Sequence, residues 1–311
     1  MGTGTPPPPE RPKRRPGRHA TRPPALAGAG SSIVDLHTHT TRSDGVLEPT
    51  ELVRDVAAAG VKVLAVTDHD TLGGYRELRA GGAIPPGLEL IAGVEINAIA
   101  RGIPLAEGEL HILGYGLDAD DEEFEAILAG QRASRRTRFE RTVALLRQVG
   151  MPIDAQITGI DLARDDALGR PTIARALIAA GFAESVEDAF QRLIGWGGPA
   201  YVPREGIGPA EAIAAIRAAG GLAALAHFSE APDQVPLLRQ LVELGLRGLE
   251  VYYRSFSAEI VTAVLAVADE LALVATGGSD YHGDLMSYAD THAALHVPPS
   301  VADRLHEALA S

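Results

Sequence analysis

The chain of 311 residues contains no cysteine, a single tryptophan and only three methionines. The absence of cysteine excludes disulfide bonds and thiolate metal sites, so any bound metal must be held by imidazole and carboxylate groups. The sequence has no run of about 18 uninterrupted apolar residues, and we therefore expect no transmembrane helix. The N-terminus lacks the apolar segment of a secretory signal. These absences are compatible with a cytoplasmic protein, which is the location we expect.

Basic residues are fewer than acidic ones, 28 against 41, and the net charge is −13. Six of the basic residues lie among the first thirty, where Glu10 is the one acid, so the rest of the chain is more acidic than the total suggests. An acidic body binds duplex DNA poorly, and we expect neither duplex DNA nor a membrane as a partner. An anionic substrate is still compatible with this charge if bound divalent ions reverse it locally. The sequence does not indicate the oligomeric state.

The chain divides into four regions by composition and periodicity. Residues 1–30 are rich in proline, arginine and glycine, and we expect a disordered tail. Short apolar runs then alternate with amphipathic stretches, a pattern typical of β/α units. Strands are expected at 33–37, 61–66, 88–96, 110–113, 222–225, 249–252 and 271–275, and helices at 49–59 and 209–219. Residues from about 119 to 195 repeat at helical spacing, which predicts a helical insertion (119–200) between two α/β parts (31–118 and 201–311).

Histidine, aspartate or glutamate stands at or near the end of almost every predicted strand. Nine such residues recur along the chain: His37, His39, Asp44, His69, Glu95, His111, His227, Asp280 and His282. The carboxyl ends of parallel strands meet at one edge of a sheet, so we expect these side chains to converge there. One such residue alone is more often an ordinary loop residue. Nine ionisable groups buried together without metal would be very costly, and the pattern therefore predicts a metal centre.

These positions resemble the motif series of the PHP (polymerase and histidinol phosphatase) superfamily. The matching segments are Asp35-Leu36-His37-Thr38-His39, Asp44-Gly45, Thr67-Asp68-His69-Asp70, Gly93-Val94-Glu95, Ala226-His227 and Gly278-Ser279-Asp280-Tyr281-His282. The helical insertion resembles the branch that hydrolyses nucleoside 3′,5′-bisphosphates and trims short RNA from the 5′ end. The resemblance implies an α/β fold, a distorted (β/α)7 barrel with an inserted helical subdomain. It also implies an enzyme, a metal-dependent phosphoesterase acting on a small phosphorylated substrate, a nucleotide or short RNA.

The resemblance further implies how the metals are held. The first metal would be bound by His37, His39, Glu95 and Asp280. Glu95 would bridge to a second, which is held also by His111 and His227, and the third would be bound by Asp44, His69 and His282. Mn²⁺, Zn²⁺ and Fe²⁺ all suit this mixed ligand set, and the sequence does not choose among them. Asp35, Asp68 and Asp70 are candidates to orient the ligating imidazoles, with backbone capping as the alternative for the last two.

The catalytic candidates are Glu95, His227 and Asp70. By the same resemblance Glu95 would bridge two metals, and His227, Asp70 or a metal-bound water would protonate the leaving oxygen. Substrate phosphate also needs arginines, which bind its oxygens bidentately. Arg170 and Arg204 are favoured, because Arg170-Pro171-Thr172-Ile173-Ala174-Arg175 and Tyr201-Val202-Pro203-Arg204 resemble the family's Arg-Pro-His-Ile-Ala-Arg and Tyr-Val-Pro-Lys segments. The insertion adds Arg132, Arg135, Arg136, Arg138 and Arg141, for which a solvated helix surface is the alternative.

Other functions stay open at this stage. A phosphatase for another small phosphate ester, such as histidinol phosphate, fits the same metal ligands. A non-catalytic metal-binding module that supports a polymerase belongs to a different class, but in such modules we expect lost ligands, and here every motif position is filled. An amidohydrolase fits less well, because its usual bridging lysine has no evident counterpart in the sequence.

Overall fold

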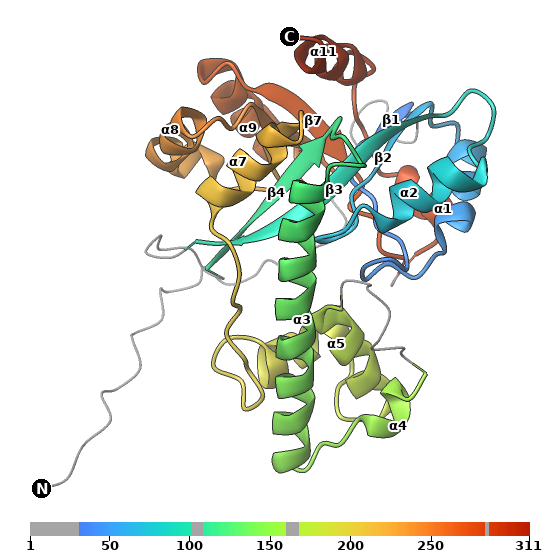
Figure 1. Ribbon diagram of the computed structural model, residues 1–311, viewed down its shortest axis with the longest axis vertical. Coiled ribbons are helices and arrows are strands. Elements are labelled where there is room, and N and C mark those ends of the chain that lie inside the picture. Colours follow the sequence, from blue (N-terminus) through green and yellow to red (C-terminus); the bar gives the residue numbers. More distant parts are fainter. Residues whose placement is uncertain (1–30, 101–107, 160–167, 284–285) are drawn as a thin grey trace, which may run out of the picture.

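The computed structural model describes residues 31–100, 108–159, 168–283 and 286–311. The predicted disordered tail lies outside these residues. The chain forms a seven-stranded sheet that curls towards a barrel, with a separate group of helices projecting from one end (Figure 1). Within the described part of the chain, no helix is long and apolar enough to cross a bilayer.

The strands follow one another in the sheet in the order of the sequence. They are β1 (Val34–Asp35), β2 (Val63–Val66), β3 (Glu89–Ile99), β4 (Glu109–Tyr115), β5 (Leu222–Leu225), β6 (Gly248–Tyr253) and β7 (Val274–Gly278). All neighbours pair in parallel except that β4 is antiparallel to both β3 and β5. The last strand returns to the first, since the Leu36 amide donates to the Gly277 carbonyl at 3.1 Å and Thr38 bridges Tyr281. The predicted distorted (β/α)7 barrel is thereby confirmed.

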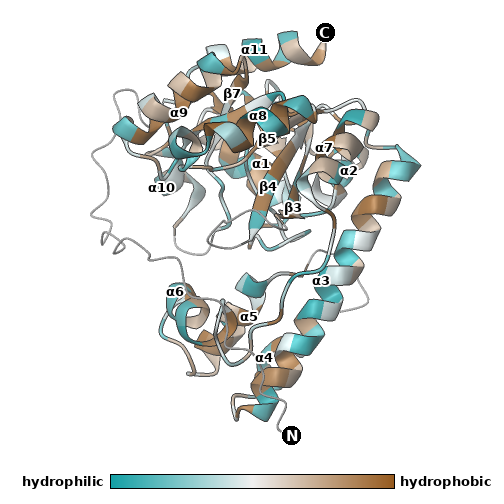
Figure 2. Cartoon of the chain, turned by 90° about the vertical axis from the view of Figure 1, so that its left-hand side faces the viewer, coloured by the Kyte–Doolittle hydropathy of each residue, from teal (hydrophilic) through white to brown (hydrophobic). Residues whose placement is uncertain are grey.

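Helices cover the outside of this barrel. They are α1 (Pro49–Ala58), α2 (Gly73–Gly81), α7 (Pro209–Ala218), α8 (Val235–Glu243), α9 (Ala258–Glu270), α10 (Tyr288–His292) and α11 (Ser300–Leu309). Proline begins α1 and α7, where its missing N–H costs nothing. The helices carry both brown and teal residues in Figure 2, as helices with one apolar and one polar face do. The largest apolar core lies between the strands and these helices, and we call it the barrel core. Leu249 and Val251, alternate residues of β6, belong to it.

The inserted helices form a second apolar core of their own. They are α3 (Glu122–Gln148), α4 (Asp154–Ile157), α5 (Arg170–Ala179), α6 (Val186–Ala189) and the π-helical turn η1 (Phe190–Ile194). Phe139 and Leu146 of α3 pack there with Leu177 of α5, whereas Phe124 and Leu128, near the start of α3, belong to the barrel core. Helix α3 is therefore shared by both cores, as Figures 1 and 2 show.

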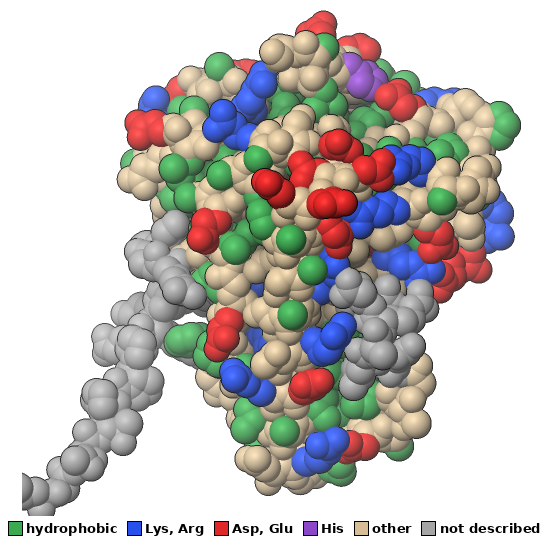
Figure 3. All heavy atoms as spheres, viewed as in Figure 1, with side chains coloured by type: hydrophobic (Ala, Val, Ile, Leu, Met, Phe, Trp, Pro, Cys, Tyr) green, Lys and Arg blue, Asp and Glu red, His purple; other side chains and the backbone are tan. Residues whose placement is uncertain are grey.

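The surface over the start of α3 is acidic (Figure 3). Some of this charge is paired with α2: Arg79 contacts Asp120 at 2.7 Å, and Arg76 contacts Glu125. Asp121 caps the helix by accepting the Phe124 amide at 2.8 Å, and acidic residues fill the first turn, where the positive end of the helix dipole favours them.

Several expected strand bounds differ from the structure, since β1 and β2 are shorter than 33–37 and 61–66. Two differences have a clear physical reason. The last strand begins at Val274 rather than at residue 271, because Leu271 still caps α9 and Ala272 has a left-handed backbone (φ +53°). The fourth strand runs opposite to the others, so Glu109 and His111 lie at its beginning. Because β4 is reversed, its beginning lies at the edge of the sheet where the other strands end. Glu109 and His111 therefore still lie near the other candidate ligands.

Candidate metal centre

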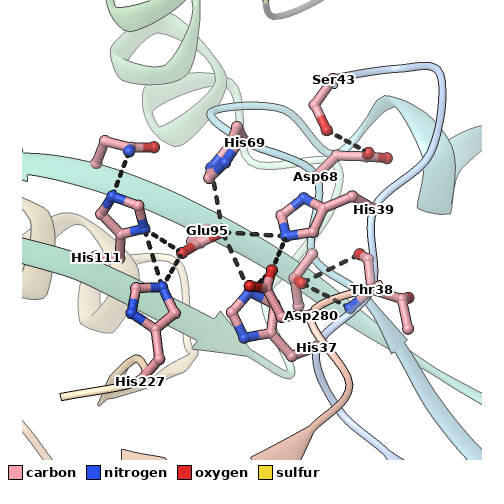
Figure 4. Close-up of polar contacts among 12 residues, drawn as sticks. His37, Thr38, His39, Ser43, Asp68, His69, Glu95, His111, His227 and Asp280 are labelled. Carbon is pink, nitrogen blue, oxygen red and sulfur yellow. Dashed lines mark hydrogen bonds and ion pairs between the residues drawn. The ribbon is translucent and has the colours of Figure 1, made fainter. Parts of the chain in front are cut away.

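Glu95 of β3 lies at the centre of the clustered histidines (Figure 4). One carboxylate oxygen, Oε2, lies 3.2 Å from Nε2 of both His37 and His39. The other, Oε1, lies 2.6 Å from Nδ1 of His111 and 3.3 Å from Nε2 of His227. One glutamate thus faces imidazoles on both sides, as a bridging ligand must.

Three groups of donor atoms surround this carboxylate, and the atoms of each group lie within 4.8 Å of one another. The first consists of His37, His39, Glu95 and Asp280; the second of Glu95, His111 and His227; the third of His39, Asp44, His69 and His282. The structure therefore brings together all nine residues that the sequence singled out. The grouping matches the one implied by the resemblance, except that His39 also faces the third group, with Nδ1 at 4.0 Å from Asp44 Oδ1.

The donor set fits divalent metal ions. Both ring nitrogens of His39, Nδ1 of His69 and Oδ1 of Asp44 are buried and have no hydrogen-bond partner among the described residues. Buried polar atoms without partners are costly, and a metal ion would satisfy several of them at once. The available donors are nitrogen and oxygen atoms, the combination that Mn²⁺, Fe²⁺ and Zn²⁺ accept.

The electrostatics keep two of the candidate ligands, Glu95 and His69, in their metal-binding form. Burial alone would raise the pKa of Glu95, but the surrounding His69, His37 and His111 hold it well below the usual range. Burial lowers the pKa of His69 to about 3, so that its imidazole is neutral at pH 7. An ionised carboxylate and a neutral imidazole are the states in which these side chains bind metals.

Strained backbone accompanies the site. Non-glycine residues with positive φ are Asp70 (+53°), His227 (+32°) and Asp280 (+49°), besides Ala272 in the turn before β7. Such conformations cost of order 1–3 kcal/mol each and persist where the surroundings enforce them. Close packing adds to the constraint at Gly278, where a Cβ atom would lie 2.4 Å from the Cβ of His37.

The three aspartates proposed to orient imidazoles have other partners. Asp68 accepts from the Thr40 amide and hydroxyl and from the Ser43 hydroxyl, each at 2.7 Å, and so fixes the loop that carries two ligands. Asp35 accepts from backbone amides and from Tyr288. Asp70 pairs with Arg135 and with Arg204, the latter at 2.8 Å. The imidazole of His37 is instead held by Glu250.

Sequence reasoning missed Glu250, which is fully buried in β6. One carboxylate oxygen lies 3.0 Å from Nδ1 of His37, and the other accepts the backbone amide of His227 at 2.7 Å. The one signal for it was an acid within an otherwise apolar strand, Gly248–Tyr253, which by itself does not reveal what the acid contacts.

A cavity of about 200 Å³ adjoins the metal centre. Its walls come from both the barrel and the insertion: Asp44, His69, Asn97, Glu109, His111, Arg135, Arg138, Phe139, Thr142, Leu168, Gly169, Arg170, Pro171, Ile173, Phe190 and Arg204. Four of the candidate substrate-binding arginines line it: Arg135, Arg138, Arg170 and Arg204. Arg136 is not among the lining residues, and Arg141 is exposed beside Glu205.

These arginines surround the carboxylates of Asp70 and Glu109. Glu109 lies 3.5 Å from Arg138, 3.7 Å from Arg170 and 3.9 Å from Arg204, too far for close hydrogen bonds. The Nη2 atom of Arg138 and the Nε atom of Arg204 are buried and have no hydrogen-bond partner among the described residues. Burial, and then Arg170 and Arg135 respectively, lower the pKa of both guanidinium groups to about 10. The cavity therefore carries more positive charge than its acids balance.

Comparison with known proteins agrees with this geometry. The profile of the PHP domain matches residues 35–196. The chain is 35% identical to a 5′-3′ exoribonuclease of Haemophilus influenzae (80% of this chain and 89% of that one). It is 31% identical to a 3′,5′-nucleoside bisphosphate phosphatase of Chromobacterium violaceum (86% and 93%). A solved structure from Bifidobacterium adolescentis, assigned to the metal-dependent phosphoesterases, superposes with a TM-score of 0.75 at 30% identity, covering 91% of this chain and 96% of the other.

Proposed function

Because this chain belongs to the PHP domain family of metal-dependent phosphoesterases, we propose that it hydrolyses nucleotide phosphate esters, either a nucleoside 3′,5′-bisphosphate or the 5′ end of short RNA. The observation that carries the proposal is the arginine-lined cavity beside the metal centre. The metal centre can take the phosphate that is cleaved. A second cationic site next to this centre suits a substrate with a second phosphate.

In this proposal three ions are bound, by the ligands His37, His39, Asp44, His69, Glu95, His111, His227, Asp280 and His282. Mn²⁺, Zn²⁺ and Fe²⁺ are the candidates. When bound, such ions supply an activated water near neutral pH and neutralise charge on the phosphoryl oxygens. Glu95 would supply a ligand to two of these groups, because its two oxygens face different sets of imidazoles.

The second phosphate binds among Arg138, Arg170 and Arg204. All three line the cavity, and Arg138 and Arg204 each have a buried donor with no hydrogen-bond partner among the described residues. Charge-assisted hydrogen bonds to phosphate are among the strongest available. Arg170 is further steadied by Phe190, whose ring centre lies 5.0 Å from the guanidinium carbon. Arg135 lies deeper and donates to Asp70 and to the Asn97 carbonyl oxygen Oδ1.

Asp70 is suited to positioning arginines rather than to donating a proton. Burial opposes ionisation, but Arg135 and Arg204 hold the pKa of this carboxyl below its usual value. An acid kept ionised has no proton to give to a leaving oxygen. Of the two side chains first considered for that step, His227 is the one we retain.

The proposal is tested with the full chain loaded with Mn²⁺. Phosphate or nucleotide release is measured from adenosine 3′,5′-bisphosphate, a 5′-phosphorylated RNA pentamer and histidinol phosphate. We expect the bisphosphate or the pentamer to have the highest kcat/KM. A strong preference for histidinol phosphate would assign the chain to another small ester. Inactivity on all three substrates with metal bound would refute nucleotide hydrolysis.

A further inference from the structure

Glu250 occupies an unusual place for an acid. Its neighbours Leu249 and Val251 point into the apolar core outside the barrel, so strand alternation sends Glu250 to the inside. The ladder between β6 and β7 is irregular here: Glu250 pairs with Thr276 and Tyr252 with Gly277, which leaves Val251 as an extra residue. Bulges of this kind redirect side chains next to functional sites. A buried carboxylate is costly unless it is fully bonded.

One oxygen of Glu250 fixes the orientation and the tautomer of the His37 ring. The carboxylate can only accept, and Oε1 lies 3.0 Å from Nδ1 of His37. The hydrogen of the neutral ring must therefore be on Nδ1. That leaves the Nε2 lone pair free, and Nε2 lies 3.2 Å from Glu95 Oε2 and 3.3 Å from Asp280 Oδ1, within the first donor group.

The other oxygen acts on the second donor group through the backbone. Oε2 accepts the amide hydrogen of His227 at 2.7 Å, where the backbone is left-handed (φ +32°). A short bond to a charged acceptor offsets the cost of this conformation. In the resulting orientation, Nε2 of His227 lies 3.3 Å from Glu95 Oε1 and 3.2 Å from His111 Nδ1.

We propose that Glu250 is a positioning residue that sets His37 of the first group and His227 of the second at once, and so couples occupancy of the two groups. This rests on the ligand set proposed above. An amide in its place would have a single acceptor oxygen, so one of the two donors would lose its partner. If the amide nitrogen faced His37, the ring hydrogen would move to Nε2 and block that ligand.

The test compares the full-length wild type, Glu250→Gln and a matched control, Tyr115→Phe. Tyr115 is also fully buried, and its hydroxyl has no hydrogen-bond partner among the described residues. Each protein is loaded with Mn²⁺ and desalted; bound metal is counted by elemental analysis, and affinity is measured by chelator competition. We expect Glu250→Gln to lose at least one equivalent or to bind about 10–100-fold more weakly, and Tyr115→Phe to match the wild type. Unchanged stoichiometry and affinity in Glu250→Gln would overturn the proposal.

A second measurement does not depend on the folding of that variant. The wild type, labelled with ¹⁵N-histidine and loaded with diamagnetic Zn²⁺, is studied by NMR, and the His37 signals are assigned from their loss in His37→Gln. We expect the hydrogen on Nδ1, and a hydrogen on Nε2 would refute the assignment. Metal binding is read without substrate, so failure of nucleotide hydrolysis leaves this result intact. A wild type that binds no stoichiometric metal would overturn both proposals.

Discussion

Replacing Arg204 by methionine tests how much the second phosphate contributes to kcat/KM, apart from the rest of the substrate. Arg204 lines the cavity, is almost fully buried and donates to Asp70 at 2.8 Å. Its Nε atom has no hydrogen-bond partner among the described residues. Methionine keeps the apolar stem and removes the charge. Asp70 retains Arg135, so we expect the fold to survive. The phosphate loses one charge-assisted hydrogen bond worth about 1.5–3 kcal/mol, which is about a 10–150-fold loss in kcat/KM.

The assay is a cycle of two enzymes and two substrates. We measure kcat/KM of the wild type and Arg204→Met on adenosine 3′,5′-bisphosphate and on whichever adenosine monophosphate the wild type cleaves. The kcat/KM of the variant should fall about 10–150-fold on the bisphosphate. On the monophosphate it should fall less than about threefold, because that substrate lacks the phosphate that Arg204 binds. The control is Arg141→Met, because the Arg141 side chain is 59% exposed and lies 3.5 Å from Glu205. Exposed pairs contribute about 1 kcal/mol at most.

The informative result is the ratio of the two losses. Equal losses on both substrates would mean that Arg204 acts through the metal centre or the fold, and the second phosphate site would be refuted. A loss of similar size in Arg141→Met would point to the overall charge of the insertion instead of to the cavity.

Three further variants probe the metal centre. Glu95→Gln should lose most activity and at least one equivalent of metal by elemental analysis; full activity would contradict the bridging role. Asp68→Ala removes three short hydrogen bonds and should lower the metal-free unfolding free energy by about 2–4 kcal/mol in urea; a change below about 0.5 kcal/mol argues against the loop-fixing role. Gly278→Ala forces a Cβ atom to within 2.4 Å of His37 and should lower Tm by several degrees, whereas Gly81→Ala, with open space, should not; equal Tm values would exclude the clash.

The clustering of the nine candidate ligands could be predicted from the sequence, because their positions follow from strand geometry. Residues at the ends of neighbouring strands must meet at one edge, so His69 and Glu95 could be placed together without coordinates. The direction of β4 could not be predicted in this way, because side chains alternate with a period of two in parallel and antiparallel strands alike. His111 reaches the cluster all the same, since it lies near the start of a reversed strand.

The supporting contacts were not predictable in the same way. Asp68 and Asp70 stand beside a ligand in the sequence, yet they bind a loop and two arginines, while the acid that holds His37 comes from more than 200 residues away. The periodicity of a sequence predicts which face of a helix or strand is buried. It does not predict which other buried side chain a residue on that face contacts.

The reversed strand has a mechanical consequence for α3. The chain leaves β4 at the edge opposite the metals, so a 27-residue helix, roughly 40 Å long, must carry it back past them. Its two ends are locked in different cores, and Arg135 and Arg138 lie between the anchors. Deleting one residue there would turn every later side chain by about 100°. The packing of both ends of α3 therefore fixes the position and the direction of the arginines between them.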